Sequence, residues 1–221
     1  QLYPHLRLKI PQVNAQGEGS DLFPYPWSIY RWIEGDVLRL DTPCNQNDIA
    51  LELAHFLQEF QKIDSTLGPK AGAHNFHRGG NLAVYAQETT TALSALSSNI
   101  NVLVCLQIFD RALASSWTQK DVWVHGDIAV GNLLLNQGHL SAVIDFGSMA
   151  VGDPACDYVM AYTFFDTEAR KRFKQTLMVD ESTWHRTQGW ALWKAVITLI
   201  KDPKDRQSNQ CIKALLEDFG H

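Results

Sequence analysis

Several protein classes are excluded by what this 221-residue sequence lacks. No apolar run reaches the roughly 18 residues that a membrane-spanning helix needs. The first residues, QLYPHLRLKIP, do not combine a charged segment with an apolar one as a signal peptide does. The 19 basic side chains are outnumbered by 24 acidic ones, and this net charge of −5 argues against a protein that neutralises nucleic-acid phosphates. We therefore expect neither a membrane nor a nucleic acid as a partner.

Cysteine is scarce and scattered along the chain. The four residues, Cys44, Cys105, Cys156 and Cys211, form no C-x-x-C pair and have no nearby histidine at metal-ligand spacing. This pattern argues against a zinc site and is typical of free thiols in a reducing compartment. We therefore expect a cytoplasmic protein.

The hydrophobic pattern predicts a mostly helical α+β domain. Residues 1–27 are rich in proline and glycine and are expected to be irregular, and the aromatic and β-branched residues that follow predict a short strand at 28–33. Apolar residues at three- and four-residue spacing, with the run after Pro154, predict helices at 47–63, 82–97, 102–115, 155–163, 168–177, 182–200 and 206–219. Short apolar segments predict hairpin strands at 122–124, 133–135 and 140–144.

One segment, VWVHGDIAVGNLLLNQGHLSAVIDFG, carries most of the chemical information. A strand ends in HGD with Asp127 last, Asn132 follows five residues later, and a hairpin delivers Asp145 at the end of its second strand. Two carboxylates and an amide oxygen suit Mg²⁺, which finds its other ligands in phosphates and water. Phosphoryl transfer uses such a set, because one carboxylate orients the acceptor hydroxyl and the other groups hold the metal. The pattern H-x-D-x-x-x-x-N followed by D-F-G has the spacing of the kinase signature.

With HGD in place of HRD, and with IDFGSMAVGDPACD further on, the segment resembles the aminoglycoside phosphotransferase family. That family has the protein-kinase-like fold, which it shares with other small-molecule kinases. The resemblance implies that Asp127 is the catalytic base and that Asn132 and Asp145 bind Mg²⁺. It also implies ATP or GTP as the phosphoryl donor and a hydroxyl group of a small molecule as the acceptor.

The same resemblance assigns roles to residues outside this set. The segment YRWIEG would be the hinge whose backbone meets the nucleotide base, through Arg31 and Ile33. GDPACD would place Asp157 on a helix behind the catalytic loop. We expect His125 and Asp157 to support that loop rather than to take part in the chemistry.

The chain departs from a complete kinase in its first part. Neither a G-x-G-x-x-G loop nor a strand with a V-A-I-K-like lysine precedes the hinge, so the N-terminal lobe is expected to be absent. Residues 1–27 would then be a lead-in, 28–35 the hinge, and 36–221 the large C-terminal lobe of the kinase-like fold. We expect this chain alone to be an incomplete part of the enzyme and to transfer phosphate poorly, because half of the nucleotide cleft would be missing. We also expect self-association through the face that a small lobe would cover.

Two other functions stay open, a metabolic kinase of the choline or homoserine type and a non-catalytic kinase-like binding module. Aminoglycosides are polycations, so an enzyme for them should line its acceptor pocket with carboxylates. The candidate carboxylates are Asp166, Glu168, Asp180, Glu181, Glu217 and Asp218. The loop with His74, His77 and Arg78 is interpreted as a plain loop, with a role near the acceptor pocket as the alternative. The tryptophans of the C-terminal part are assigned to the core.

Overall fold

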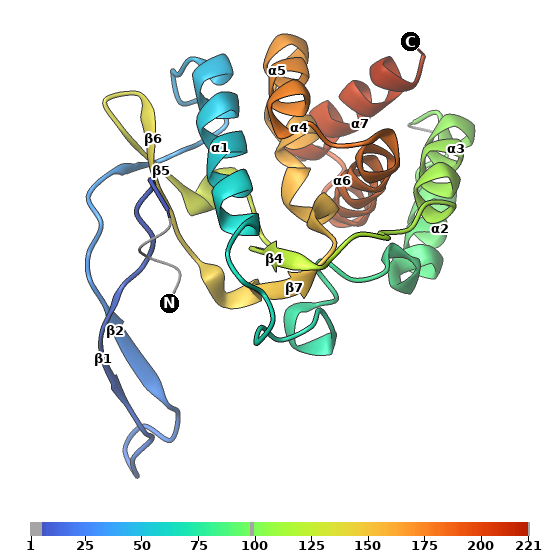
Figure 1. Ribbon diagram of the computed structural model, residues 1–221. Helices are drawn as coiled ribbons and strands as arrows, with labels where there is room; N and C mark the ends of the chain where they lie inside the picture. The colour runs from blue at the N-terminus through green and yellow to red at the C-terminus, as the bar shows by residue number, and fades with distance from the viewer. Residues whose placement is uncertain (1–5, 98–99, 221) are drawn as a thin grey trace.

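The computed structural model describes residues 6–97 and 100–220 and confirms a helical α+β fold (Figure 1). The helices are α1 (Gln46–Gln61), α2 (Ala86–Ala95), α3 (Val102–Leu113), α4 (Met160–Thr163), α5 (Thr167–Leu177), α6 (Glu181–Lys201) and α7 (Arg206–Phe219). The strands are β1 (Val13–Gly17), β2 (Trp27–Tyr30), β3 (Asp36–Val37), β4 (Val122–Val124), β5 (Leu133–Asn136), β6 (His139–Val143) and β7 (Ala150–Gly152).

The helices form the body of the molecule and enclose its core. α1 packs against α5, while α6 packs against α2, α3 and α7 (Figure 1). The apolar stripe predicted on α1, with Ile49, Leu53, Leu57 and Phe60, is fully buried. Burial of one such side chain stabilises a fold by about 1.5–3 kcal/mol, so these contacts hold the helices in place around the site. Among the described residues, no helix is both long and apolar enough to cross a membrane.

Side-chain caps set where several helices begin. Asp166 accepts a hydrogen bond from the N–H of Ala169 at 2.9 Å, and Asp180 accepts one from the N–H of Thr183 at 2.6 Å. Asp205 caps α7 in the same way. A capping side chain satisfies a backbone donor that the helix itself leaves unpaired, so the carboxylates at 166, 180 and 205 have local structural partners.

Two small antiparallel sheets carry the segment with the kinase-like motif. β5 pairs with β6 and also with the short β3, and β4 pairs with β7, where Val124 lies opposite Ala150. The turn between β5 and β6 uses Gln137 and Gly138, both with positive φ. The loops that follow β4 and β6 contact each other, because the ring of His125 lies against the carbonyl oxygen of Ile144.

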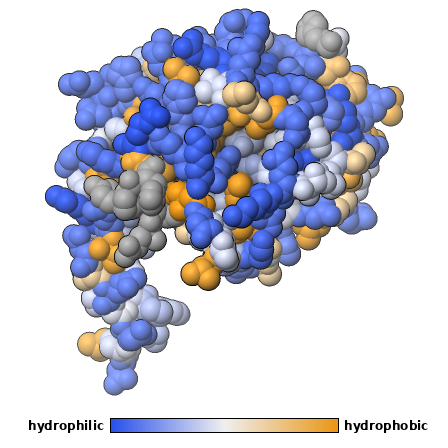
Figure 2. Space-filling view, in the orientation of Figure 1, coloured by the Kyte–Doolittle hydropathy of each residue, from blue (hydrophilic) through white to orange (hydrophobic). Residues whose placement is uncertain are grey.

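We expected the lead-in of residues 1–27 to be irregular. It is not irregular throughout, because β1 lies within it and pairs antiparallel with β2. The sequence VNAQG has little strand propensity, so the pairing partner rather than local preference forms this strand. The predicted strand at 28–33 begins one residue earlier and ends at Tyr30. The β1–β2 hairpin projects from the helical body, and its visible face mixes hydrophobic and hydrophilic residues (Figure 2).

Candidate active site

The loop that carries the HGD motif begins where β4 ends, and Asp157 holds its backbone. This carboxylate accepts hydrogen bonds from the N–H of His125 at 2.6 Å and from the N–H of Gly126 at 2.8 Å. Asp157 is fully buried, and burial raises its pKa, while the two donors favour the charged form. Gly126 has a φ of +80°, and a Cβ there would lie 2.4 Å from the carbonyl oxygen of Ser148. Geometry therefore requires glycine as the middle residue of HGD.

The buried ring of His125 joins two parts of the site. Its Nδ1 accepts a hydrogen bond from the N–H of Asp127 at 3.2 Å, and its Nε2 lies 3.0 Å from the carbonyl oxygen of Ile144. Since a carbonyl oxygen only accepts, this pattern assigns the ring proton to Nε2. Phe146 packs edge-on against the ring at a centroid distance of 4.6 Å. These contacts link the loop that carries Asp127 to the loop that carries Asp145.

Asn132 provides a second link between the two loops. Its side-chain nitrogen donates to the backbone oxygen of Asp127 at 2.8 Å and to the carboxylate Oδ2 of the same residue at 3.2 Å. Its backbone carbonyl accepts a hydrogen bond at 2.9 Å from the N–H of Ile144, the residue before Asp145. With its nitrogen turned toward Asp127, the amide leaves its oxygen without a hydrogen-bond donor among the described residues. That oxygen is available as a ligand.

Asp145 stands at the end of the second loop in an uncommon conformation. Its φ of 64° and ψ of 64° place it in the left-handed region, and its Oδ1 accepts a hydrogen bond from the N–H of Gly147 at 3.4 Å. Few residues other than glycine adopt this conformation, although aspartate tolerates it better than most. Such residues gather at functional sites. Asp145 is also exposed, so its carboxylate is accessible to a ligand.

The oxygen donors at this site fit a magnesium ion better than a zinc ion. Asn132 and Asp145 offer an amide oxygen and a carboxylate. In residues 6–97 and 100–220, no three or more His, Cys, Asp or Glu side chains gather as they would in a closed metal site. Mg²⁺ is commonly held by one or two carboxylates together with substrate phosphates and water. The residues present therefore suit a magnesium ion that binds together with a nucleotide.

A large apolar cavity of about 840 Å³ lies beside Asp145. Val37, Leu134, Ile144 and Met149 form apolar parts of its wall, and Asp145 is among the lining residues. A flat aromatic base fits an apolar cleft of this kind when a few polar groups fix its orientation. The cavity therefore combines an apolar cleft of this kind with the exposed carboxylate of Asp145.

The predicted hinge residues Arg31 and Ile33 both line this cavity. The N–H of Arg31 donates to the backbone oxygen of Gln12 at 2.8 Å, so this amide is already used within the protein. Neither the N–H nor the C=O of Ile33 has a backbone partner among the described residues. Of these two residues, Ile33 therefore offers both of its backbone groups to a ligand and Arg31 offers only its carbonyl.

Asp127 faces a different cavity, of about 340 Å³. Apolar side chains form much of its wall, and Trp190 from α6 is one of them. Asp127 and Asp145 thus line two cavities, while hydrogen bonds through Asn132 and His125 connect their loops. The six carboxylates considered for a polycation site do not line the cavity beside Asp127: Asp166, Glu168, Asp180, Glu181, Glu217 and Asp218.

The cavity beside Asp127 also includes two cationic side chains. Lys194, one turn of α6 after Trp190, was not identified from the sequence, whereas Arg78 comes from the loop that we interpreted as a plain loop with a role near the acceptor pocket as the alternative. The signal for Arg78 was the glycine pair after it, where Gly79 has a φ of +81° and lies close to Val124 of β4. No sequence pattern marked Lys194, because a lysine on a long helix is ordinarily solvated.

Solved structures with a similar fold include three phosphotransferase complexes or apoenzymes. The GDP and kanamycin complex of APH(2")-IIia matches with a TM-score of 0.63 and 21% identity over 99% of this chain and 78% of that one. The streptomycin-ATP-APH(2")-IIa ternary complex matches with a TM-score of 0.58 and 18% identity over 96% of this chain and 75% of that one. The macrolide 2'-phosphotransferase MphH of Brachybacterium faecium matches with a TM-score of 0.56 and 15% identity over 97% of this chain and 76% of that one. These likenesses establish a shared fold.

Sequence comparison is more specific. No curated protein sequence matches this chain. The profile described as "Phosphotransferase enzyme family" matches residues 1–190, which is most of the chain and includes the segment with Asp127, Asn132 and Asp145. The chain therefore belongs to the phosphotransferase enzyme family, which confirms the resemblance and the enzyme class that its motifs predict.

Proposed function

We propose that this protein transfers the terminal phosphoryl group of ATP or GTP, with Mg²⁺, to a hydroxyl group of a small molecule. One observation carries the proposal. Asp127 and Asp145 each line a cavity, and the hydrogen bonds of Asn132 join the loops on which they stand. A transfer between two bound molecules needs two sites that meet at the reacting groups. Similar structures are described as complexes with GDP and kanamycin and with ATP and streptomycin, which supports a nucleotide in one cavity and an acceptor in the other.

Each residue of the set has a distinct role in this proposal. In the acceptor cavity, Asp127 orients the attacking hydroxyl and accepts its proton. The amide oxygen of Asn132 and the carboxylate of Asp145 hold Mg²⁺, which when bound neutralises charge on the phosphate oxygens. His125 and Asp157 keep the loop in place through the backbone contacts described above. The proposal extends to the hinge, where Arg31 and Ile33 bind the base through their backbone groups.

Calorimetry with ATP and with GTP tests this proposal. We expect at least one nucleotide to bind in the presence of Mg²⁺ and to bind much more weakly without it. Asp145→Asn removes the charge of a metal ligand and should weaken binding by about tenfold or more, which corresponds to about 1.4 kcal/mol. Asp166→Asn is the matched control, because an asparagine at this position would still cap α5 and the position lies outside both cavities.

Two results would contradict the proposal. One is the failure of both nucleotides to bind, which would favour the non-catalytic binding module. The other is nucleotide binding that neither Mg²⁺ nor Asp145→Asn alters, since the metal site would then not be at this position.

A further inference from the structure

The acceptor cavity beside Asp127 contains two cationic side chains without ionic partners. Arg78 and Lys194 both line it, and among the described residues neither forms an ion pair. Of the two carboxylates in the wall, Asp127 has the role proposed above. Asp205 caps α7, where the N–H of Ser208 donates to it at 2.7 Å and the positive end of the helix dipole compensates its charge. The lining therefore holds two cationic side chains that no carboxylate of the described residues pairs.

Arg78 is held in a fixed position by aromatic side chains. Its guanidinium carbon lies 4.8 Å from the ring centroid of Trp193 and 6.0 Å from that of Trp190. Stacking of this kind orients the planar guanidinium while its donors stay available. The side chain of Arg78 donates no hydrogen bond within the described residues, and its Nε is buried. The guanidinium of Arg78 is thus held in place while its hydrogen-bond donors remain free to bind a ligand.

A second buried donor in the same cavity wall also lacks a partner. The indole Nε1 of Trp190 is buried and makes no hydrogen bond within the part of the chain that the structure describes. Buried donors are nearly always paired, and leaving one unpaired costs free energy. Two residues of the lining, Arg78 and Trp190, thus each carry an unpaired donor, and a ligand that supplies acceptor oxygens complements them.

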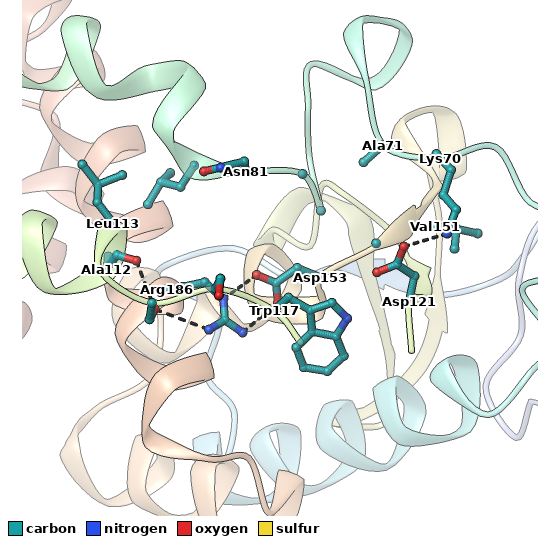
Figure 3. Close-up of a pocket in the computed structure, with 16 residues that line it drawn as sticks. Lys70, Ala71, Asn81, Ala112, Leu113, Trp117, Asp121, Val151, Asp153 and Arg186 are labelled. Atoms are coloured by element: carbon teal, nitrogen blue, oxygen red, sulfur yellow. Dashed lines mark hydrogen bonds and ion pairs between the residues drawn. The ribbon is translucent and has the colours of Figure 1, made fainter. Parts of the chain in front are cut away.

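Another cavity of about 360 Å³ shows the opposite arrangement (Figure 3). There, Arg186 forms a buried ion pair with Asp153, with 2.6 Å between Nε and Oδ2, and Lys70 pairs with Asp121 at 2.6 Å. Figure 3 shows both pairs within the lining of this cavity. All the charged side chains of this cavity are paired with one another, so the unpaired cations beside Asp127 are not a general property of the fold.

We propose that the acceptor substrate is an anionic hydroxy compound, whose carboxylate or phosphate group binds Arg78 and Lys194 while its hydroxyl lies at Asp127. The guanidinium fork matches either oxyanion through two parallel hydrogen bonds. This inference rests on the proposed function, because it assigns Asp127 to the acceptor side. A polycation such as an aminoglycoside would bring its ammonium groups against two unpaired cations, and like charges in a partly buried site repel.

The test follows the ¹⁵N resonances of the Arg78 Nε–H and the Trp190 Nε1–H by NMR, with the ionic strength held constant by sodium chloride. The probes are glycolate, inorganic phosphate and kanamycin. We expect glycolate or phosphate to shift both resonances saturably and kanamycin to leave them unchanged. A response to glycolate identifies a carboxylate site, and a response to phosphate identifies a phosphate site.

Variants then assign the effect to the two cations. Arg78→Gln should weaken the response of Trp190 by about tenfold, the loss expected for a charge-assisted bidentate contact, while Arg78→Lys should weaken it less. Lys194 is exposed, so Lys194→Gln should fold normally and also weaken binding, which keeps the test valid if Arg78→Gln does not fold.

Three results would overturn the inference: no saturable response to either anion, a saturable response to kanamycin, or an unchanged response in the variants that fold. Calorimetry with nucleotides is a separate readout. If nucleotides bind with Mg²⁺ but no anion shifts the two resonances, the acceptor class is wrong and the proposed function stands. If the anions bind and no nucleotide does, the proposed function is wrong.

Discussion

Asp157 fixes the backbone of the HGD loop through its side chain. Its carboxylate oxygens accept hydrogen bonds from two consecutive backbone N–H groups in a fully buried place. In Asp157→Asn, one oxygen becomes an NH₂ group that faces a donor, so one buried N–H loses its acceptor. We expect the free energy of unfolding to fall by about 1–3 kcal/mol, measured by urea unfolding.

Asp166→Asn is the matched control for this prediction as well. Asparagine caps a helix about as well as aspartate, so the control should change the free energy of unfolding by less than about 0.5 kcal/mol. Equal stability of Asp157→Asn and wild type would show that the two hydrogen bonds do not hold the loop.

Because the pKa of Asp157 is raised, the difference in the free energy of unfolding between wild type and Asp157→Asn should depend on pH. Because burial raises this pKa in the folded state, the folded protein binds the proton more tightly than the unfolded chain does. The stability that wild type gains over Asp157→Asn should therefore be largest below the ordinary aspartate pKa of about 3.9 and should decline as the pH rises through the raised value. Urea unfolding of both proteins from acid to neutral pH measures this. An advantage that grows with pH would mean that the backbone donors outweigh burial.

Residue spacing predicted part of the site and could not predict the rest. The Asp127–Asn132 spacing is local, since a short turn of the chain brings the two side chains into hydrogen-bond contact. Arg78, Trp190 and Lys194 come from distant parts of the chain and meet only when the loop after α1 packs against α6. A pattern within one segment of the sequence cannot predict contacts between residues that come from distant segments. The roles of all these residues stay predictions until a ligand is bound.

At the scale of elements, periodicity located the long helices well and the short ones less well. The last helix was predicted with its observed bounds, and α6 within one residue at each end. The helix predicted at 82–97 instead begins as a 3-10 turn, Leu82–Tyr85, and the one predicted at 155–163 begins as another, Pro154–Tyr158. Both follow a side-chain cap, at Asn81 and Asp153. A strong cap fixes where a helix begins but not which helical form it takes first.

The packing of α6 against α3 depends on a glycine in the middle of α6. A Cβ on Gly189 would lie 2.5 Å from the Cβ of Ala112 and 2.5 Å from a methyl group of Leu82. Such a distance forces the helices apart, so Gly189→Ala should destabilise the protein by about 1–3 kcal/mol despite its better helix propensity. Gly131→Ala is the control, because a Cβ there meets nothing within 4 Å. Thermal unfolding of both variants tests this, and a Gly189→Ala protein as stable as the control would show that this helix contact can relax.

At the scale of the whole molecule, the sequence predicted the α+β class, the family and the enzyme class, but not how the first part of the chain is arranged. The β1–β2 hairpin exposes apolar side chains, among them Leu22 at 98% and Trp32, in the loop after β2, at 81% of their accessible surface. Self-association through the face that a small lobe would cover stays a prediction, as does the cytoplasmic location expected from cysteines that are free in the structure.

The central claim is that Asp127, Asn132 and Asp145 meet where a nucleotide and its metal are bound. The most direct test is a crystal structure with Mn²⁺ in place of Mg²⁺ and a non-hydrolysable ATP or GTP analogue, with the metal located by its anomalous scattering. We predict a peak about 2.1 Å from the amide oxygen of Asn132 and from the carboxylate of Asp145, with the base in the cavity lined by Ile33 and with Asp127 facing the terminal phosphate. A bound nucleotide whose metal lies away from both side chains would contradict this account.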